Sequence, residues 1–237
     1  MDINLLINQE NEIAYNSITE CEELVRNTEG LITILSEITE IKSKKAAVFY
    51  FLIKQVINSM HQCLVSSLRR HEVQAQLMLR HSIETACLAA YSLYDSKMEN
   101  YIINDEVGAK PVNNAKSKAY GWLDKNYPNQ SLKLKQIKDQ INEYYAHGNM
   151  FNSLRGISDK DVNKNINYFD KRDLLLEKTY IWQVGYTACI IFDLIYQSSK
   201  KCDFVIVSEG VFETFKDLVE VNQRYRLEFM QEKRLLR

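Results

Sequence analysis

The chain has 237 residues, 46% of them hydrophobic, and a formal net charge of −1. This balance argues against a molecule that binds nucleic acid or a membrane through its overall charge. Only two prolines and seven glycines are present, which favours long helices over turns. The five cysteines are odd in number and form no CxxC pair, as is typical of reduced core thiols. No secretory signal pattern opens the chain, so we expect a soluble cytoplasmic protein without a membrane partner.

The composition predicts an all-α fold, a helical bundle in one domain over 1–237. We expect three parts: acidic N-terminal helices over 1–42, a core bundle over 45–200 and a C-terminal helix over 209–237.

The N-terminal part is predicted to hold two helices, over about 9–26 and 31–41, with a turn at 27–30. Residues 1–40 contain nine acidic residues and one basic residue, Arg26. The segment is therefore strongly acidic.

Two long helices are predicted next. From 45 to 69 apolar residues recur at steps of three and four. From Val73 to Tyr94 the only formal charges are Arg80 and Glu84, so this helix is expected to be buried on nearly all sides. Either a tight turn near 70–72 or one long bent helix joins the two, and we favour the turn.

Arg80 and Glu84 are spaced four residues apart, so their side chains can meet on one helix face. The face is otherwise apolar, and a charged side chain is seldom buried unless it is paired. One interpretation is a structural ion pair that fixes how the helices pack. The other is a polar cluster that binds a ligand or does chemistry.

A mixed connection follows over 96–110, with a short helix near 98–103. Pro111 is placed to open a helix that runs to about 126. A turn at 127–130 and a helix over 132–147 complete this region.

The segment 110–138 carries seven lysines against one acid, Asp124, and interleaves them with Tyr120, Trp122 and Tyr127. Lysine contacts to phosphate, together with stacking of bases on aromatic rings, suit single-stranded nucleic acid. The alternative is a solvated, amphipathic helix pair. The candidate nucleic-acid-binding residues are Lys116, Lys118, Lys125, Lys133 and Lys135.

The segment 150–170 has little helical period and is predicted to form a short polar excursion or β-hairpin. A buried helix follows over 172–199, in which Asp193 is a polar insertion that could face Arg80 or a tyrosine. Residues 204–207 are either a short extended piece or the lead-in to the last helix.

The last helix, from about 209 to the end, has a heptad-like apolar seam with Asn222 as a polar position. The seam fits packing on the chain's own bundle, or a dimer arm.

Motifs of metal and nucleotide chemistry are absent. His61, His71 and His81 are ten residues apart and do not share a helix face, and no HExxH, Walker or dinucleotide fingerprint occurs. We expect no metal and no cofactor.

His147 lies in NEYYAHGN at a predicted helix end, one turn after Tyr144, where it can act as an acid or base. The alternative is a favourable interaction with the carbonyls of that helix end.

The motifs LRHSIETA on the central helix and YYAHGN at a later helix end resemble uncharacterised bacterial members of the HEPN (higher eukaryotes and prokaryotes nucleotide-binding) superfamily. The resemblance covers roughly 45–200. It implies a helical bundle that forms a homodimer and, in many members, a metal-independent ribonuclease of toxin–antitoxin or phage-defence systems. The superfamily's usual Arg-x4–6-His pattern does not precede His147, since no arginine lies between Arg80 and Arg155.

Three functions are therefore expected as alternatives. The first is a non-catalytic binding or interaction protein with an RNA or protein partner. The second is a ribonuclease in which His147 is the acid or base, Arg80 stabilises phosphate charge, and Tyr144 or Glu84 orients them. The third is a pocket for a small molecule. Its candidate ligand-binding residues are Tyr91, Arg155, Trp182, Tyr186 and Asp193.

Overall fold

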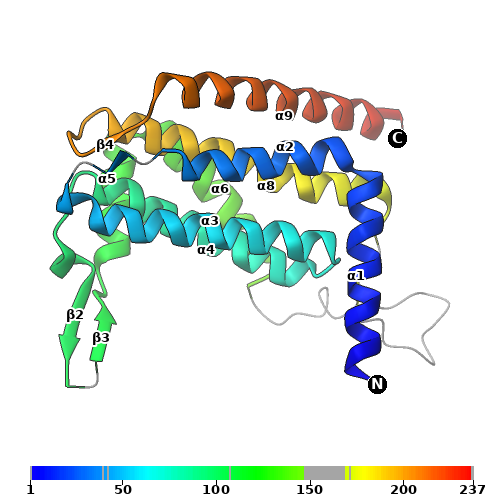
Figure 1. Ribbon diagram of the computed structural model, residues 1–237, viewed down its shortest axis with the longest axis horizontal. Helices are drawn as coiled ribbons and strands as arrows, with labels where there is room; N and C mark the ends of the chain where they lie inside the picture. Colours follow the sequence, from blue (N-terminus) through cyan, green and yellow to red (C-terminus); the bar gives the residue numbers. More distant parts are fainter. Residues whose placement is uncertain are drawn as a thin grey trace.

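The computed structural model describes residues 2–38, 40–41, 43–106, 108–146, 169–170 and 172–235. Within them it shows an all-α helical bundle with two small strand pairs, which confirms the predicted fold class (Figure 1). The elements are α1 (Ile3–Glu20), α2 (Glu22–Thr33), the 3-10 turn η1 (Ile34–Ser36), β1 (Glu40–Ile41), η2 (Lys44–Ala46), α3 (Ala47–Leu68), α4 (Glu72–Ser92), η3 (Met98–Asn100), β2 (Ile102–Asp105), β3 (Gly108–Pro111), α5 (Ala115–Asn126), α6 (Pro128–Tyr144), α8 (Leu174–Ser199), β4 (Val205–Ile206) and α9 (Glu209–Leu235).

Helices α3 and α4 pack along their whole lengths as an antiparallel pair. The turn between them is tight, as predicted, and Arg70 adopts a positive φ of 58° in it. Helix α4 is not buried on nearly all sides, however. Gln74, Leu77 and His81 form an exposed stripe along it, because α3, α5, α6 and α8 cover only its other sides.

Helix α8 lies at the centre of the bundle and contacts α2, α3, α4, α6 and α9. From Ile181 to Ile195 its aliphatic side chains are buried, including Ile191 and Leu194. At Gly185 a Cβ atom would lie 2.8 Å from the Asn222 side chain and 3.0 Å from that of Thr28. The glycine therefore allows α2 and α9 to approach α8 closely.

The predicted N-terminal helix over 9–26 is wrong in its bounds. The structure has two helices, which meet at Cys21, and the expected turn at 27–30 lies inside α2, where Asn27 and Thr28 are buried. Helix α1 begins earlier than predicted because the Asp2 side chain caps it by accepting a hydrogen bond from the Asn4 backbone. This helix projects away from the bundle, across the direction of the other helices (Figure 1).

A β-hairpin stands where a mixed connection was expected. Strands β2 and β3 pair antiparallel, with Ile102 opposite Pro111, and the hairpin projects from the same side of the bundle as α1 (Figure 1). Pro111 ends β3 and does not open a helix. Pro128, placed in a turn by the sequence pattern, is instead the first residue of α6, where its missing N–H costs no hydrogen bond.

The last part of the chain folds back over the bundle. Strand β4 pairs antiparallel with β1, and α9 covers α2 and α8 (Figure 1). Phe215, Asn222 and Phe229 of α9 are buried, so its seam packs on the chain's own bundle. Among the described helices, none is long and apolar enough to cross a membrane. The excursion predicted over 150–170, with His147 and Arg155, falls almost wholly outside the residues that the structure describes.

Candidate functional site

The predicted pair of Arg80 and Glu84 forms, but near the surface. Arg80 Nε lies 3.4 Å from Glu84 Oε1, and Lys116 Nζ lies 2.7 Å from Glu84 Oε2. The Arg80 side chain is 36% exposed. The expectation of a fully buried pair is therefore wrong, because both residues lie at the junction of α4 with α5, where long side chains reach water. Burial tends to raise the pKa of Glu84, but the hydrogen bond and charge of Lys116, aided by Arg80, hold it below its ordinary value.

The candidate catalytic residues fall into separate places. Tyr144 lines a small cavity of about 150 Å³ near the end of α6, together with Gln76 and Gln183. Arg80 and Glu84 are not among the residues around that cavity. His147 lies outside the described residues, so the proposed pairing of Arg80 with His147 stays a prediction.

The residues predicted to bind a small molecule also lie in different places. Asp193 accepts a hydrogen bond from Gln130 (2.7 Å), whereas the carboxylate that Arg80 contacts is that of Glu84. Tyr186 lines the same 220 Å³ cavity as Asp193 and Lys133. Trp182 stacks on Tyr186 at 5.1 Å and donates its indole N–H to the Asn222 carbonyl, so it serves packing between α8 and α9. Arg155 lies outside the described residues.

A buried charge cluster, which the sequence reading missed, lies where α4, α6 and α8 meet. Glu72 is 2% exposed and Glu177 is completely buried. Arg70 Nη2 donates to Glu177 Oε2 at 2.9 Å, and the hydroxyls of Tyr145 and Tyr180 donate to Glu72. The cluster joins three helices through hydrogen-bonded charges.

Arg172 completes this cluster. Its side chain is 1% exposed, donates to the Ser67 carbonyl at 2.9 Å and lies over the Tyr180 ring. Burial lowers the pKa of Arg172, whereas the carboxylates of Glu72, Asp170 and Glu177 oppose that shift. Such a network is typical of packing specificity. Its sequence signals are charged residues at the turn into α4 and around the start of α8.

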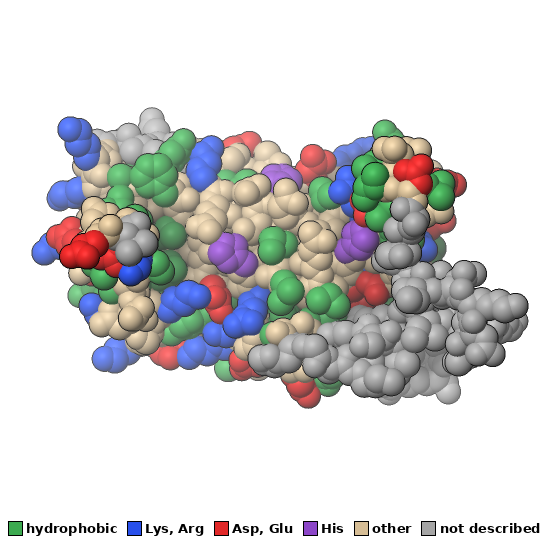
Figure 2. Space-filling view, turned by 90° about the horizontal axis from the view of Figure 1, so that it is seen from below, with side chains coloured by type: hydrophobic (Ala, Val, Ile, Leu, Met, Phe, Trp, Pro, Cys, Tyr) green, Lys and Arg blue, Asp and Glu red, His purple; other side chains and the backbone are tan. Residues whose placement is uncertain are grey.

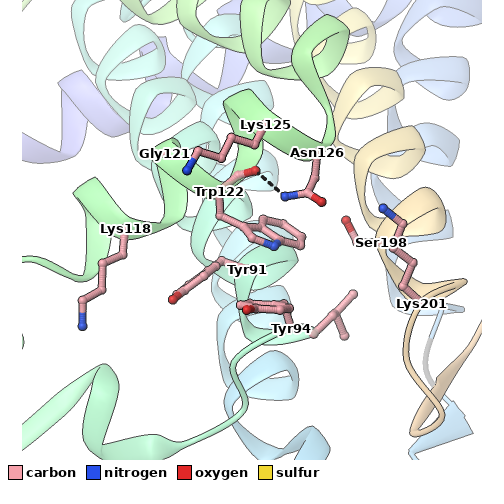
Figure 3. Close-up of a pocket in the computed structure, with 10 residues that line it drawn as sticks. Tyr91, Tyr94, Lys118, Gly121, Trp122, Lys125, Asn126, Ser198 and Lys201 are labelled. Carbon is pink, nitrogen blue, oxygen red and sulfur yellow. Dashed lines mark hydrogen bonds between the residues drawn. The ribbon is translucent and has the colours of Figure 1, made fainter.

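A larger pocket lies at the end of the bundle where α4, α5 and α8 terminate. It has a volume of about 680 Å³, and Figure 3 shows its aromatic and lysine side chains. We call it the aromatic–lysine pocket. Its lining consists of Tyr91, Leu93, Tyr94, Lys118, Gly121, Trp122, Lys125, Asn126, Ser198 and Lys201.

Three aromatic rings form one wall of the pocket. Trp122 stacks on Tyr94 with ring centroids 5.6 Å apart and planes 25° apart, and Tyr91 meets Trp122 edge-on at 5.7 Å. Tyr94 is 70% exposed, so an aromatic surface faces the solvent. Asp95 fixes the chain beside it, since its carboxylate accepts from Tyr91 and Asn100.

Helix α5 supplies most of the other residues that line the pocket. Lys118, Gly121, Trp122 and Lys125 recur at steps of three, one and three, which places them on one helix face. Lys201 comes from the end of α8 and lies on the opposite side of the aromatic rings from Lys118 (Figure 3). Among the described residues that line the pocket, none is acidic.

The structure thus brings together Tyr91, Lys118 and Lys125, which the sequence analysis assigned to two different sites. The other candidate lysines lie elsewhere. Lys116 pairs with Glu84, Lys135 pairs with Asp124, and Lys133 lines the smaller cavity beside Asp193. Lys201 was missed because no local pattern links it to α5.

Comparison of the chain with protein-family models, with curated proteins and with solved structures finds no match. Within the described residues, no group of three or more His, Cys, Asp or Glu side chains could hold a metal ion. The aromatic–lysine pocket is larger than the two cavities described above, and its lining combines aromatic rings with lysines.

Proposed function

We propose that this chain is a non-catalytic binding protein that holds single-stranded nucleic acid in the aromatic–lysine pocket. The observation that carries the proposal is the stack of the exposed Tyr94 on the partly buried Trp122, with lysines on either side. Aromatic rings stack on any base, and each stacked base contributes about 1–3 kcal/mol to binding. Lysine ammonium groups bind the phosphates that flank the base.

The charge around the rings supports an anionic ligand. Lys118, Lys125 and Lys201 surround the pocket, and the described residues that line it include no carboxylate to offset their positive potential. A cavity of about 680 Å³ also lies within the range of about 300–1,000 Å³ that is usual for ligand pockets. The pocket therefore suits one nucleotide unit of a strand that continues over the surface.

Gly121 gives independent support. Glycine inside a helix costs about 1 kcal/mol relative to alanine, and a Cβ atom at this position would meet nothing within 4 Å. Packing therefore does not require the glycine. Its missing side chain leaves the α5 surface beside Trp122 open to a ligand.

The proposal is tested by fluorescence anisotropy with labelled 12-nucleotide single strands of RNA and of DNA. Three phosphate contacts predict that log K falls against log salt with a slope of about −2, since each contact to a single strand contributes about −0.7. We expect Lys118→Ala and Lys125→Ala each to weaken binding and to reduce that slope. Lys133→Ala is the matched control, because Lys133 is also an exposed lysine, on α6, but lines another cavity.

Absence of binding to both strands at low salt would overturn the proposal, as would equal losses in Lys133→Ala and Lys118→Ala. A higher affinity for the RNA or for the DNA identifies which of the two nucleic acids is the ligand. Incubating the same complexes in EDTA also tests the alternative of a metal-independent ribonuclease that uses Arg80 and His147. The proposal predicts that the RNA stays intact.

A further inference from the structure

The lysines of the aromatic–lysine pocket suit phosphate, which every nucleotide of a strand carries. Figure 2 shows Lys and Arg side chains gathered over the end of the molecule that carries the hairpin and α5. Contacts to phosphate position a strand but carry no information about its bases, and stacking on an aromatic ring also tolerates any base. A preference among bases, which rests on the single-strand binding proposed above, must therefore come from uncharged polar groups of the lining.

Asn126 supplies such a group. It follows Trp122 by one turn of α5, and its side-chain Nδ2 donates to the Trp122 carbonyl at 2.9 Å. Because only the amide nitrogen can donate to a carbonyl, this hydrogen bond fixes which way the amide is turned. The amide oxygen, Oδ1, is left as an acceptor. In Figure 3 this oxygen points away from the Trp122 carbonyl, toward the side of the pocket where Ser198 and Lys201 lie.

The other neutral side chains of the lining do not offer a donor to the edge of a stacked base. The Ser198 hydroxyl is 2% exposed and donates to the Leu194 carbonyl at 2.8 Å, and the Tyr91 hydroxyl donates to Asp95. The ring N–H and O–H groups of the stacked aromatic pair lie in the planes of their rings, so a base stacked on either face does not meet them. The Ser198 oxygen keeps lone pairs, so it can also accept.

We propose that the pocket prefers a base with an exocyclic amino group, such as cytosine or adenine, over uracil or thymine. The amino group donates to Asn126 Oδ1, and Ser198 Oγ, which comes from α8, is a second acceptor of the lining. Uracil presents a carbonyl oxygen where cytosine has its amino group, so two acceptors face each other there without a hydrogen bond. Polar groups that stay unpaired in this way make a hydrogen-bonding site selective.

Oligocytidine and oligouridine test the preference, because their bases have the same ring size and differ in the amino and carbonyl groups of one edge. We expect the wild type to bind a labelled 12-nucleotide strand of cytidine about three- to tenfold more tightly than one of uridine, the effect of about one neutral hydrogen bond. Each strand is measured with ribose and with deoxyribose. A strand of purine riboside, which is adenosine without its amino group, should likewise bind more weakly than oligoadenosine.

Two variants assign the preference to its residue. Asn126→Ala removes the acceptor and should bring the ratio of the cytidine and uridine affinities to about one. Asn129→Ala is the matched control, because Asn129 is also an exposed asparagine, on α6, but does not line the pocket. It should keep the ratio of the wild type. Circular dichroism confirms that both variants are folded.

The outcomes separate this preference from the binding on which it rests. Equal affinities of the wild type for the two strands, or tighter binding of oligouridine, would overturn the preference and leave single-strand binding intact. A preference that persists in Asn126→Ala, or that disappears in Asn129→Ala, would also overturn it. Absence of binding to every strand at low salt would overturn the proposed function itself, and the preference with it.

Discussion

Gly121 and Gly185 differ in what an added Cβ atom would contact. At Gly121 the space is open, so Gly121→Ala should raise the free energy of unfolding by about 0.5–1 kcal/mol, the helix-propensity difference. At Gly185 the same change meets Asn222 and Thr28 within about 3 Å, so it should lower that free energy by about 1–3 kcal/mol. Urea denaturation of both variants measures the contrast, and a stabilised Gly185→Ala protein would contradict the packing described between α2, α8 and α9.

Glu84 gives a prediction about pH. Its pKa is lowered in the folded chain from an ordinary value of 4.5. A lowered folded-state pKa contributes stability above the ordinary pKa, and this contribution is lost as the pH falls through the folded-state value. Glu84→Gln should therefore be less stable than the wild type at pH 7, by under about 1 kcal/mol because the site is partly exposed. Denaturation at pH 7 and at pH 3 should show the difference shrink, and a constant difference would exclude the assigned ion pairs.

At the scale of elements, the buried charge cluster holds α4 and α8 together. Removing one member of a buried, hydrogen-bonded pair leaves the other charge uncompensated, which typically costs about 3–5 kcal/mol. We expect Glu177→Ala to destabilise the fold by about that amount, because Glu177 is completely buried against Arg70. Glu213→Ala, which removes an ion pair to Lys216 on the surface, should change little. Equal unfolding midpoints for the two variants would show that the cluster does not stabilise the bundle.

The helices were predictable from the sequence where their apolar period was long. The ranges 45–69 and 172–199 and the helix from 209 agree with α3, α8 and α9 to within a few residues. The predictions were wrong where a helix cap or the pairing of two strands determines which residues form an element. The Asp2 cap set the start of α1, and the β2–β3 pairing was invisible because both strands are exposed along their length and have no apolar alternation.

The candidate site was predictable only in pieces. The pattern of lysines and aromatics identified Lys118, Trp122 and Lys125, which share one face of α5. Lys201 and Tyr94 join them only through the packing of α4, α5 and α8, which no local pattern encodes. The same limit applies to the Arg80–Glu84 pair, since spacing predicted the contact but not that Lys116 and solvent would share it.

At the scale of the whole molecule, the aromatic–lysine pocket lies at one end of the bundle, where α4, α5 and α8 end. The resemblance to the HEPN superfamily stays a prediction, since none of the comparisons finds a match.

The most direct test of nucleic-acid binding is the affinity of Tyr94→Ala for the labelled single strands. Loss of one stacking ring should cost about 1–3 kcal/mol, which is roughly a fivefold to 150-fold weaker affinity. Tyr15→Ala is the matched control, because Tyr15 on α1 is 71% exposed and Tyr94 is 70% exposed. A selective loss in Tyr94→Ala would support the aromatic–lysine pocket as the binding site. Unchanged affinity in Tyr94→Ala, with the fold intact by circular dichroism, would contradict it.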